Sequence, residues 1–346
     1  MNNALHPPAR PQVARLEVED LHVRFDTDEG SVLAVNGVSF ALQAGEVLAL
    51  VGESGCGKSM TAMAVLGLLP PTATPSGSIR LEGRDISGLS QRELRAIRGR
   101  DISMIFQEPM TSLNPVFTVG HQIGEVLRRH EGLGRKEARA RAIELLDLVR
   151  IPSARTRVDE YPHQMSGGMR QRVMIAMAVA CNPKVLLADE PTTALDVTIQ
   201  AQILDIMRDL RQELGTSIVM ITHDLGVVAD IADRVVVMYA GHVAETGTVD
   251  AVFANPQHPY TLGLLGSVPR PDLVLADVQD RLAEIPGVVP TLRQPATECV
   301  FAPRCPRADK NCLVRMPELT ETAPGQRAAC VHPGPAEAEQ REAVRV

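Results

Sequence analysis

The residues best suited to chemistry form the segment GESGCGKS, which runs from Gly52 to Ser59. It follows an apolar run (47–51) and precedes a helical pattern, which is the setting of a phosphate-binding loop, or P-loop. Backbone N–H groups of such a glycine-rich turn, and the positive end of the helix, bind phosphates. Lys58 is expected to contact the β- and γ-phosphates of a nucleotide, and Ser59 to coordinate Mg²⁺. The residues predicted to bind the nucleotide are Gly52, Ser54, Gly55, Cys56, Gly57, Lys58, Ser59 and Met60.

Two carboxylates follow a second apolar run, in the segment VLLADEP (185–191). Carboxyl ends of parallel strands meet at one edge of a sheet, so Asp189 and Glu190 are expected beside the P-loop. Asp189 is predicted to hold Mg²⁺, directly or through water. Glu190 is predicted to polarise the attacking water as a general base.

A third candidate is MSGGMRQR (165–172), which opens a long helical pattern that continues to Ala180. Ser166 followed by Gly167 and Gly168 at the start of a helix can bind an anion. The same residues also suit an ordinary helix N-cap.

Short apolar runs, typical of buried parallel strands, alternate with helical patterns. This alternation predicts an α/β fold, with a parallel sheet covered by helices. We expect no strand in a helical insertion at about 108–165. From residue 256 onward lie 13 of the 25 prolines, so this tail should be rich in loops. The predicted strands are 47–51, 185–188, 217–221 and 234–238, and the predicted helices are 58–69, 135–150, 166–180 and 199–214.

Composition narrows the function classes. The net charge of -7 gives no basic field for nucleic acid, and aromatic residues make up only 3% with no Trp, which disfavours base stacking. No apolar run reaches ~18 residues, and the N-terminus lacks the apolar stretch of a signal peptide. We therefore expect a protein of the cytoplasm whose six cysteines form no disulfide framework.

The order of five motifs resembles one known family. The P-loop, Gln107, SGGMRQR, DEPTTALD and ITHD follow one another as in the ATP-binding subunits of ABC transporters, over about residues 16–255. The chain is most similar to the ATPases of bacterial dipeptide/oligopeptide importers, because of FQEPMTSLNP, Met169 and NPQHPYTLGLL. The resemblance implies a P-loop ABC-type nucleotide-binding domain, with a mixed-sheet core and a helical subdomain. It also implies a Pro/Cys-rich C-terminal extension.

The same resemblance assigns four further residues. Phe25 would stack on adenine, unless it is a core residue at the end of a strand. Gln107 would contact Mg²⁺ and water, and His223 would contact the γ-phosphate. Asp196 would lie in a loop at a dimer interface, and it also suits the N-cap of the helix that contains Ile199.

In this family two ATPase subunits share their sites. Ser166, Gly167 and Gly168 would complete the ATP site of a second ATPase subunit, for which we favour a paralogue. Further implied partners are two transmembrane permease subunits and a substrate-binding protein, but no nucleic acid. The chain would lie on the cytoplasmic face of the inner membrane. The expected division is a flexible N-terminus (1–15), the nucleotide-binding domain (16–255), the extension (256–335) and a tail (336–346).

Four cysteines in the proline-rich segment follow the pattern C-x5-C-x6-C-x17-C, namely Cys299, Cys305, Cys312 and Cys330. Four thiols in a segment with little core can hold a metal or cluster that folds it. The resemblance implies a [4Fe-4S] cluster, with zinc as the second choice and free thiols as the third. His332 is a spare candidate ligand.

Charges between these cysteines could offset the charge of a cluster, and they belong to Arg304, Arg307 and Lys310. Because the tail lies far from the P-loop in sequence, we expect the ATP site to be independent of it.

Other functions remain open at this point. They are a soluble ABC ATPase of DNA repair or translation, an importer ATPase for nickel or another small solute, and a tail that senses redox state. Long coiled-coil insertions of repair proteins and the doubled ATPase modules of translation proteins do not occur in this sequence.

Overall fold

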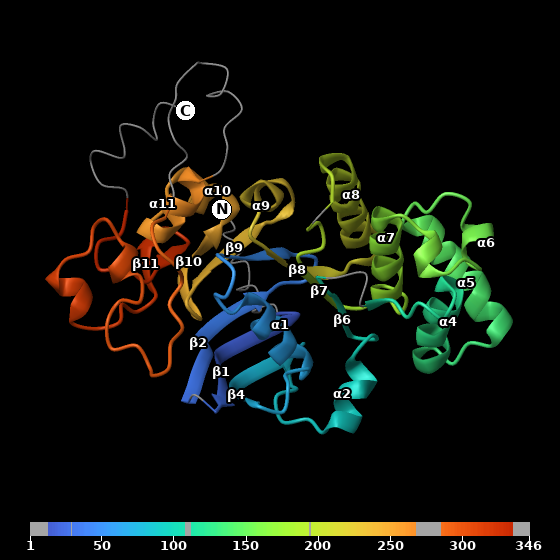
Figure 1. Cartoon of the computed structure of the whole chain (residues 1–346), viewed down its shortest axis with the longest axis horizontal. Coiled ribbons are helices and arrows are strands. Elements are labelled where there is room, and N and C mark those ends of the chain that lie inside the picture. The colour runs from blue at the N-terminus through green and yellow to red at the C-terminus, as the bar shows by residue number, and fades with distance from the viewer. Residues whose placement is uncertain (1–12, 29, 108–111, 194, 268–284, 335–346) are drawn as a thin grey trace, which may run out of the picture.

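Two β-sheets form the centre of the protein in this computed structural model, which describes residues 13–28, 30–107, 112–193, 195–267 and 285–334. The larger sheet has the strand order β11-β12-β10-β9-β3-β8-β7-β6, and the smaller sheet has the order β2-β1-β4-β5. Helices of the middle of the chain lie at one end of the molecule, and the C-terminal strands at the other (Figure 1).

Five neighbouring strands of the larger sheet run parallel. They are β6 (Ile102–Ile105), β7 (Val185–Asp189), β8 (Ser217–Thr222), β3 (Val47–Val51) and β9 (Arg234–Tyr239). Burial on both faces explains why each reads as a continuous apolar run. The four predicted strands are confirmed to within one residue, and β6 was not predicted. The sheet is mixed, because β10 (His242–Thr248), β12 (Gln326–Ala328) and β11 (Thr320–Ala323) pair antiparallel.

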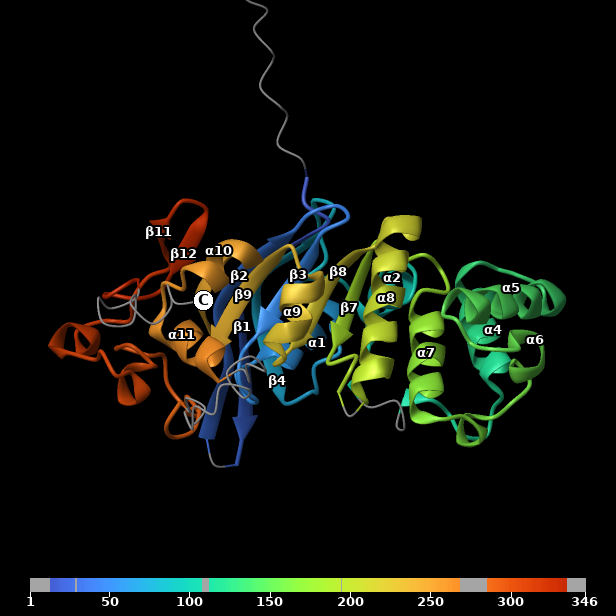
Figure 2. The same cartoon turned by 90° about the horizontal axis from the view of Figure 1, so that it is seen from above.

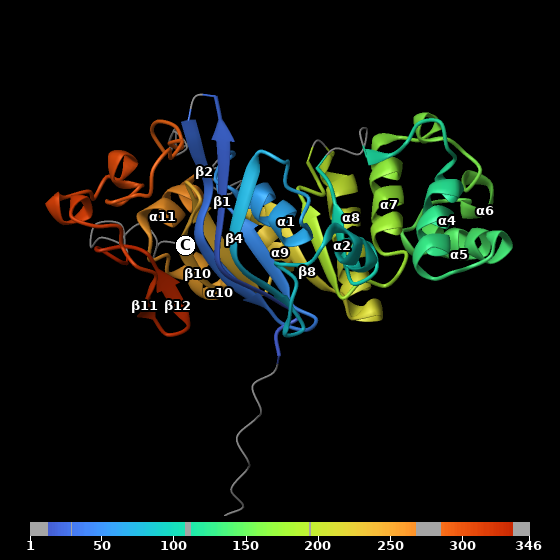
Figure 3. The same cartoon turned by 90° about the horizontal axis from the view of Figure 1, so that it is seen from below.

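The smaller sheet is antiparallel and was not assigned from the sequence. Its strands are β1 (Leu16–Thr27), β2 (Gly30–Leu42), β4 (Ala73–Leu81) and β5 (Arg84–Asp85). One face packs against α1 (Lys58–Leu66) and the larger sheet, in a buried cluster that includes Leu16, Leu48 and Val65. This packing places α1, and with it the P-loop, between the two sheets (Figure 3).

Helix ends follow local chemistry. The helix α1 stops at Leu66 rather than at residue 69, because Gly67 adopts the left-handed conformation (φ 61°) that ends helices. The helix α8 (Val197–Leu214) ends at Gly215, as predicted. The helix predicted at 135–150 is α5 (Arg135–Leu148), which ends two residues earlier. The helix predicted at 166–180 is α7 (Gly167–Ala178), which also ends two residues earlier. The remaining helices near the sheets are α2 (Gln91–Ile97), α9 (Leu225–Ile231) and α10 (Val249–Ala254).

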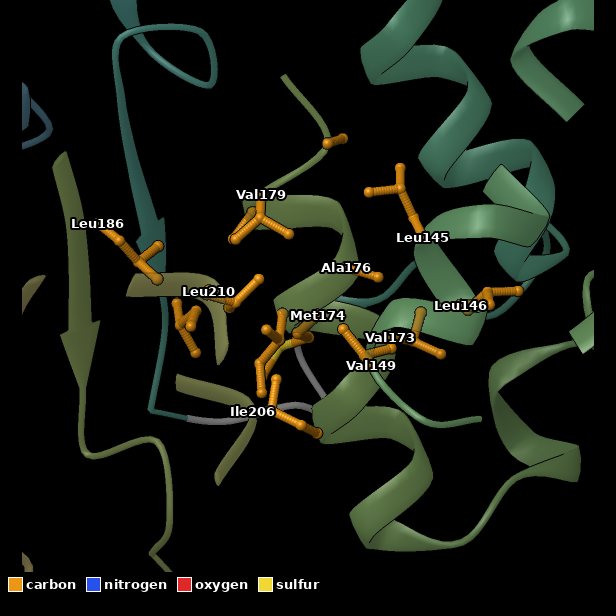
Figure 4. Packing of buried hydrophobic residues seen from close by; sticks show 14 of the residues in the cluster. Leu145, Leu146, Val149, Val173, Met174, Ala176, Val179, Leu186, Ile206 and Leu210 are labelled. Atoms are coloured by element: carbon orange, nitrogen blue, oxygen red, sulfur yellow. The ribbon is translucent and has the colours of Figure 1, made fainter. Parts of the chain in front are cut away.

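The described part of the segment 108–165 is helical, as expected, with no strand among residues 112–165. It holds α4 (Val119–His130), α5, α6 (Ala154–Arg157) and a 3₁₀ turn (Pro162–Gln164), and these lie beside α7 and away from the sheets (Figure 2). Figure 4 shows how Leu145 and Leu146 of α5 meet Val173 of α7, while Met174 faces Ile206 of α8. One buried cluster therefore joins the insertion to the sheet through α7.

The C-terminal region, here residues 256–267 and 285–334, lies toward the β10 edge of the larger sheet, whereas the insertion lies toward the β6 edge. It contains α11 (Pro259–Gly266), 3₁₀ turns (Ala302–Arg304 and Lys310–Leu313), β11 and β12. Tyr260 and Phe301 belong to a buried cluster with Ala49 and Val51 of β3. The strand that leads into the P-loop thus has the C-terminal region on one face. Among the described residues, no helix is both long and apolar enough to cross a membrane.

Candidate functional site

The P-loop connects β3 to α1 and needs glycine at two crowded positions. A Cβ at Gly52 would lie 2.2 Å from the carbonyl oxygen of Met238, and one at Gly57 would lie 2.4 Å from that of Ala34. Both residues also have positive φ, at 150° and 98°. Gly57 is the N-cap of α1, so no side chain competes for the first N–H groups of that helix. These groups are free to bind an anion.

Lys58 is buried, and its ammonium lies against the backbone of the loop. It donates hydrogen bonds to the carbonyl oxygens of Gly52 (2.7 Å) and Glu53 (3.0 Å). The buried thiol of Cys56 lies 3.6 Å from the same ammonium, and burial raises its pKa. A Cβ at Gly52 would lie 2.8 Å from this sulfur, so Cys56 occupies a position with little space. The loop therefore holds one fixed positive charge.

Ser59 and Asp189 lie together where a metal ion is predicted. The Ser59 hydroxyl donates a hydrogen bond of 3.1 Å to a carboxylate oxygen of Asp189. Burial raises the pKa of this carboxyl, although the hydrogen bond from Ser59 acts in the opposite direction. A hydroxyl and a carboxylate, both oxygen donors, suit Mg²⁺. The donor set thus fits the predicted ion.

Glu190 is the centre of a polar cluster at the next position of the chain. One carboxylate oxygen accepts from Gln107 (2.9 Å) and Thr193 (2.8 Å), and the other lies 3.0 Å from Nδ1 of His223. Burial acts to raise the pKa of Glu190, but the contacts with Thr193 and His223 and the charge of Lys58 bring it below its usual value. The carboxylate is therefore ionised near neutral pH.

The backbone places this cluster by strand order. Gln107, Glu190 and His223 follow β6, β7 and β8, which are neighbours in the sheet. Glu190 has φ 45°, a left-handed conformation that is rare for a residue with a Cβ and costs ~1–3 kcal/mol. Thr193 was missed by the sequence analysis, although a hydroxyl three residues after Glu190 was a usable signal.

Ser166 and Gly167 lie exposed at the start of α7. The Ser166 hydroxyl accepts a hydrogen bond of 3.3 Å from the N–H of Met169, so the N-cap geometry is confirmed. A Cβ at Gly167 would meet nothing within 4 Å, whereas one at Gly168 would lie 2.8 Å from Ile199. Within the described ranges, no hydrogen bond or ion pair joins these residues to Lys58 or Ser59.

Three other predicted residues lie apart from the cluster. Asp196 is the N-cap of α8, since its carboxylate accepts from the N–H of Ile199 (3.0 Å), and it is exposed. Phe25 lies on β1, half-buried against the core between the two sheets. Met60 of α1 packs, also half-buried, against the same core. Their contacts with a nucleotide stay predictions, as does the pairing of Asp196 with a second subunit.

The four C-terminal cysteines come together around one cavity. Cys299, Cys305, Cys312 and Cys330 all line it, beside His258, Arg307 and His332. Burial raises the pKa of Cys330 to about 11, and the nearness of the other three thiols adds to this shift. Asp309, Cys312 and His332 also present ligand atoms within 4.8 Å of one another. Residues spread over 32 positions of the sequence thus form one thiol-rich site.

One expectation about this region is wrong. Arg304 was named as one of three charges that could offset a cluster, but its side chain points to the P-loop and pairs with the Glu53 carboxylate (2.7 and 2.9 Å). The tail is therefore not separate from the ATP site in space. The sequence analysis also missed Tyr260, whose hydroxyl accepts a hydrogen bond of 2.8 Å from the N–H of Glu53.

Comparisons with known proteins agree with the geometry of both regions. The profile of the family described as ABC transporter matches residues 35–193, and the profile described as oligopeptide/dipeptide transporter, C-terminal region, matches residues 244–312. The dipeptide transport ATP-binding protein DppD of Bacillus subtilis is 54% identical over 313 residues, which are 90% of each chain. The oligopeptide transport ATP-binding protein OppD of Salmonella typhimurium is 52% identical over 94% of this chain and 95% of that protein.

A solved structure supports the fold of the larger part. The ATP-binding cassette MJ0796, in a dimeric post-hydrolysis state bound to ADP and Pi, superposes with a TM-score of 0.61 at 29% identity. The match covers 68% of this chain and 98% of that one.

Proposed function

Because this chain belongs to the ABC transporter ATP-binding subunits that carry the oligopeptide/dipeptide transporter C-terminal region, we propose that its site binds and hydrolyses ATP to energise peptide import. The relatives are dipeptide and oligopeptide transport proteins, which favours transport over DNA repair or translation. They also favour peptides over nickel as cargo. The chain is an ATPase whose work is coupled to a membrane permease.

Phosphate binding is assigned to the P-loop. The phosphates are received by backbone N–H groups of the loop and of the start of α1, with Ser54, Gly55 and Cys56 in the turn, whereas the N–H of Glu53 is donated to Tyr260. Lys58 already lies against the loop, so its ammonium needs only a short movement from backbone carbonyls to phosphate oxygens. Ser59 and Asp189, with Gln107 nearby, would hold Mg²⁺, which neutralises charge on the phosphates when bound. Phe25 is proposed to stack on adenine.

The proposed catalytic role of Glu190 rests on the three side chains that contact its carboxylate. An ionised carboxylate beside the P-loop can orient a water molecule and accept its proton. Gln107 and Thr193 hold one oxygen, and His223 lies against the other, so the direction of the carboxylate is defined before ATP binds. We assign Glu190 as general base, and Gln107 and His223 as groups that contact water and the γ-phosphate.

A second ATPase subunit completes the proposed site. Ser166 and Gly167 are exposed at a helix start, Gly168 follows them half-buried, and a helix start favours anions. They are assigned to the nucleotide of the partner subunit, and Asp196 to the interface between the two. The dimeric state of MJ0796 supports such a pair. We favour a paralogous partner, since peptide importers of this family typically use one.

The thiol-rich site is proposed to hold a [4Fe-4S] cluster, with zinc as the alternative. Four cysteine thiols around one cavity match the ligand set of both. Because the described part of residues 299–334 has only short elements, a bound group would add to its folding free energy. His332, paired with Asp309 at 3.0 Å, is assigned no ligand role.

Placement at a membrane follows from the partners. We propose that the helical insertion around α4 and α5 receives a cytoplasmic segment of the permease, so the chain is peripheral on the inner face of the membrane. Two permease subunits and a substrate-binding protein complete the importer. In this proposal residues 16–255 are the nucleotide-binding domain and residues 256–335 the extension, flanked by an N-terminus (1–15) and a tail (336–346).

Reconstitution tests this function. The chain, its second ATPase and the permease that co-purifies with them are placed in vesicles and supplied with the substrate-binding protein. ATP hydrolysis should rise when that protein carries a di- or oligopeptide, and peptide should accumulate. Stimulation by nickel complexes or sugars, with none by peptides, would contradict the assigned cargo while leaving the ATPase assignment intact.

A further inference from the structure

Among the described residues, the hydrogen bonds between the C-terminal region and the P-loop meet at Glu53. This is the second residue of the loop, and its backbone carbonyl accepts a hydrogen bond from Lys58. Its side-chain carboxylate accepts two hydrogen bonds from Arg304, in the paired geometry that makes guanidinium–carboxylate contacts strong. The two residues are 251 positions apart in sequence.

The surroundings of Arg304 fix its guanidinium in the orientation that pairs with Glu53. Its side chain is 6% exposed, and every guanidinium nitrogen has a partner. Nε donates to the carbonyl oxygen of Pro286 (2.7 Å), and one Nη donates to that of Ile285 (3.0 Å). The other Nη also lies 3.4 Å from the hydroxyl of Tyr239. These contacts orient the fork, so that both remaining N–H groups meet Glu53.

Tyr260 holds the backbone of the same loop residue. Its side chain is fully buried, and its hydroxyl oxygen accepts from the N–H of Glu53 at 2.8 Å. The ring packs edge-on against Tyr239 of β9 and tilted against Phe301 of the C-terminal region. Glu53 is thus held through its main chain by α11 and through its side chain by the turn that contains Arg304.

Phosphate binding depends on where the N–H groups of the loop point. A peptide plane that rotates at Glu53 redirects the carbonyl that Lys58 uses and the N–H groups that follow. We propose that Arg304 and Tyr260 are positioning residues for nucleotide binding. Through them the C-terminal region holds Glu53, and with it the backbone of the P-loop, in place. This inference rests on the proposed role of the P-loop.

The proposal is tested on the full-length purified chain with MgATP as the probe. The variants are Arg304→Ala, Glu53→Gln and Tyr260→Phe, with Arg315→Ala as a matched control, because Arg315 is an exposed arginine of the same region. We expect Arg304→Ala to raise the Kd about tenfold, equivalent to ~1.4 kcal/mol. Tyr260→Phe should raise it by a smaller factor, and the control should not change it.

A double-mutant cycle separates positioning from a general loss of structure. If Arg304 acts through Glu53, the Kd of Arg304→Ala/Glu53→Gln should be no higher than that of the worse single variant. Amide hydrogen exchange of residues 299–330 shows whether the region stays folded. If Arg304→Ala unfolds it, Glu53→Gln and Tyr260→Phe decide alone, since neither opens a large cavity.

Two negative results have different meanings. A wild-type Kd in Glu53→Gln, Tyr260→Phe and folded Arg304→Ala overturns the positioning role. Absence of MgATP binding by the wild-type chain, or a Kd unaffected by Lys58→Ala, contradicts instead the proposed function of the P-loop.

Discussion

Glu190 shows how a single residue combines strain and hydrogen bonding. Its left-handed backbone conformation is unfavourable, yet it turns the side chain toward Gln107 and His223. Strain of this kind persists where surrounding contacts determine the geometry, which is common at functional sites. The lowered pKa keeps the carboxylate ionised, which is the form that can accept a proton.

Substitution of this carboxylate should separate binding from hydrolysis. Glu190→Gln keeps the shape and the contact with Gln107 but cannot accept a proton, so single-turnover hydrolysis by the assembled complex should fall ~10²–10⁴-fold. The Kd for MgATP should stay unchanged. Glu213→Gln, at an exposed position of α8, is the control. A rate within a few-fold of wild type would remove Glu190 from the role of base.

Lys58 should act on binding instead. Lys58→Ala removes the one ammonium held against the loop, and a charge-assisted hydrogen bond contributes ~1.5–3 kcal/mol. The Kd for MgATP should therefore rise about 10- to 100-fold, as measured by equilibrium binding to the purified chain. Lys136→Ala, on the exposed side of α5, should bind as wild type. Equal affinities of the two variants would refute the phosphate contact.

His242 of β10 should make stability depend on pH. Burial, and to a lesser degree the charge of His22, lowers its pKa to about 4. A pKa that is lower in the folded than in the unfolded state adds stability above pH 6.5, and this is lost as pH falls toward 4. The free energy of unfolding should drop by about 2 kcal/mol more between pH 7 and 5 in wild type than in His242→Gln. Parallel pH curves for the two proteins would contradict this.

Among the elements, α7 has buried sides and an exposed N-terminal end. Val173 and Met174 pack between the helical insertion and α8, so the helix is fixed in place (Figure 4). Its N-terminal end remains exposed at Ser166 and Gly167. A rigid helix with an open start is well suited to present N–H groups to a nucleotide held by another subunit.

A bulky residue at this helix start should prevent the two ATPase subunits from pairing without weakening ATP binding by the isolated chain. Ser166→Arg should leave the Kd of the isolated chain for MgATP unchanged, because the described contacts do not join Ser166 to its own P-loop. Cross-linking of the ATP-bound pair should fall strongly, whereas Ala140→Arg, on exposed α5, should cross-link as wild type. Reduced affinity of the isolated chain with normal pairing would reject the shared site.

At the scale of the whole molecule, the nucleotide site lies between two unlike regions. The helical insertion packs through α7 against the larger sheet, and the C-terminal region contacts the P-loop at Glu53 (Figures 1 and 2). A structural change in either region could therefore alter the nucleotide site. The insertion has a large packed core, whereas the C-terminal region contributes Tyr260 and Phe301 to a smaller buried cluster with β3.

Loss of one thiol should affect both the thiol-rich site and nucleotide binding at the P-loop. Protein purified without oxygen should contain about four irons and four sulfides per chain. Cys305→Ser should lose them, unfold residues 299–330 in hydrogen exchange and, because Arg304 is the preceding residue, raise the Kd for MgATP. Cys181→Ser, in which the cysteine lies outside this site, is the control.

The metal content distinguishes the alternatives. Stoichiometric zinc without sulfide would identify a zinc site, and absence of iron, sulfide and zinc from oxygen-free protein would contradict any bound group. Bound metal in Cys305→Ser at the wild-type level would remove Cys305 from the ligand set.

The sequence by itself determined the features that are local in the chain. The glycines of the P-loop, the apolar runs of β3, β7, β8 and β9, and the carboxylates after β7 lie within short segments whose residue types dictate their backbone. The order of these segments was enough to predict the family and to bring Glu190 beside the P-loop. The N-terminal antiparallel sheet was missed because its strands are long and partly exposed, so their apolar pattern is interrupted.

Only the tertiary structure decided which distant residues meet. Spacing of the cysteines suggested a shared site but could not show four thiols around one cavity. Arg304 lies between two of them in sequence, and for that reason its charge was considered as one that could offset a cluster. Packing of Tyr260 and Phe301 against β3 instead turns Arg304 toward Glu53. A long-range ion pair depends on how buried surfaces fit together, and no local pattern in the chain encodes that fit.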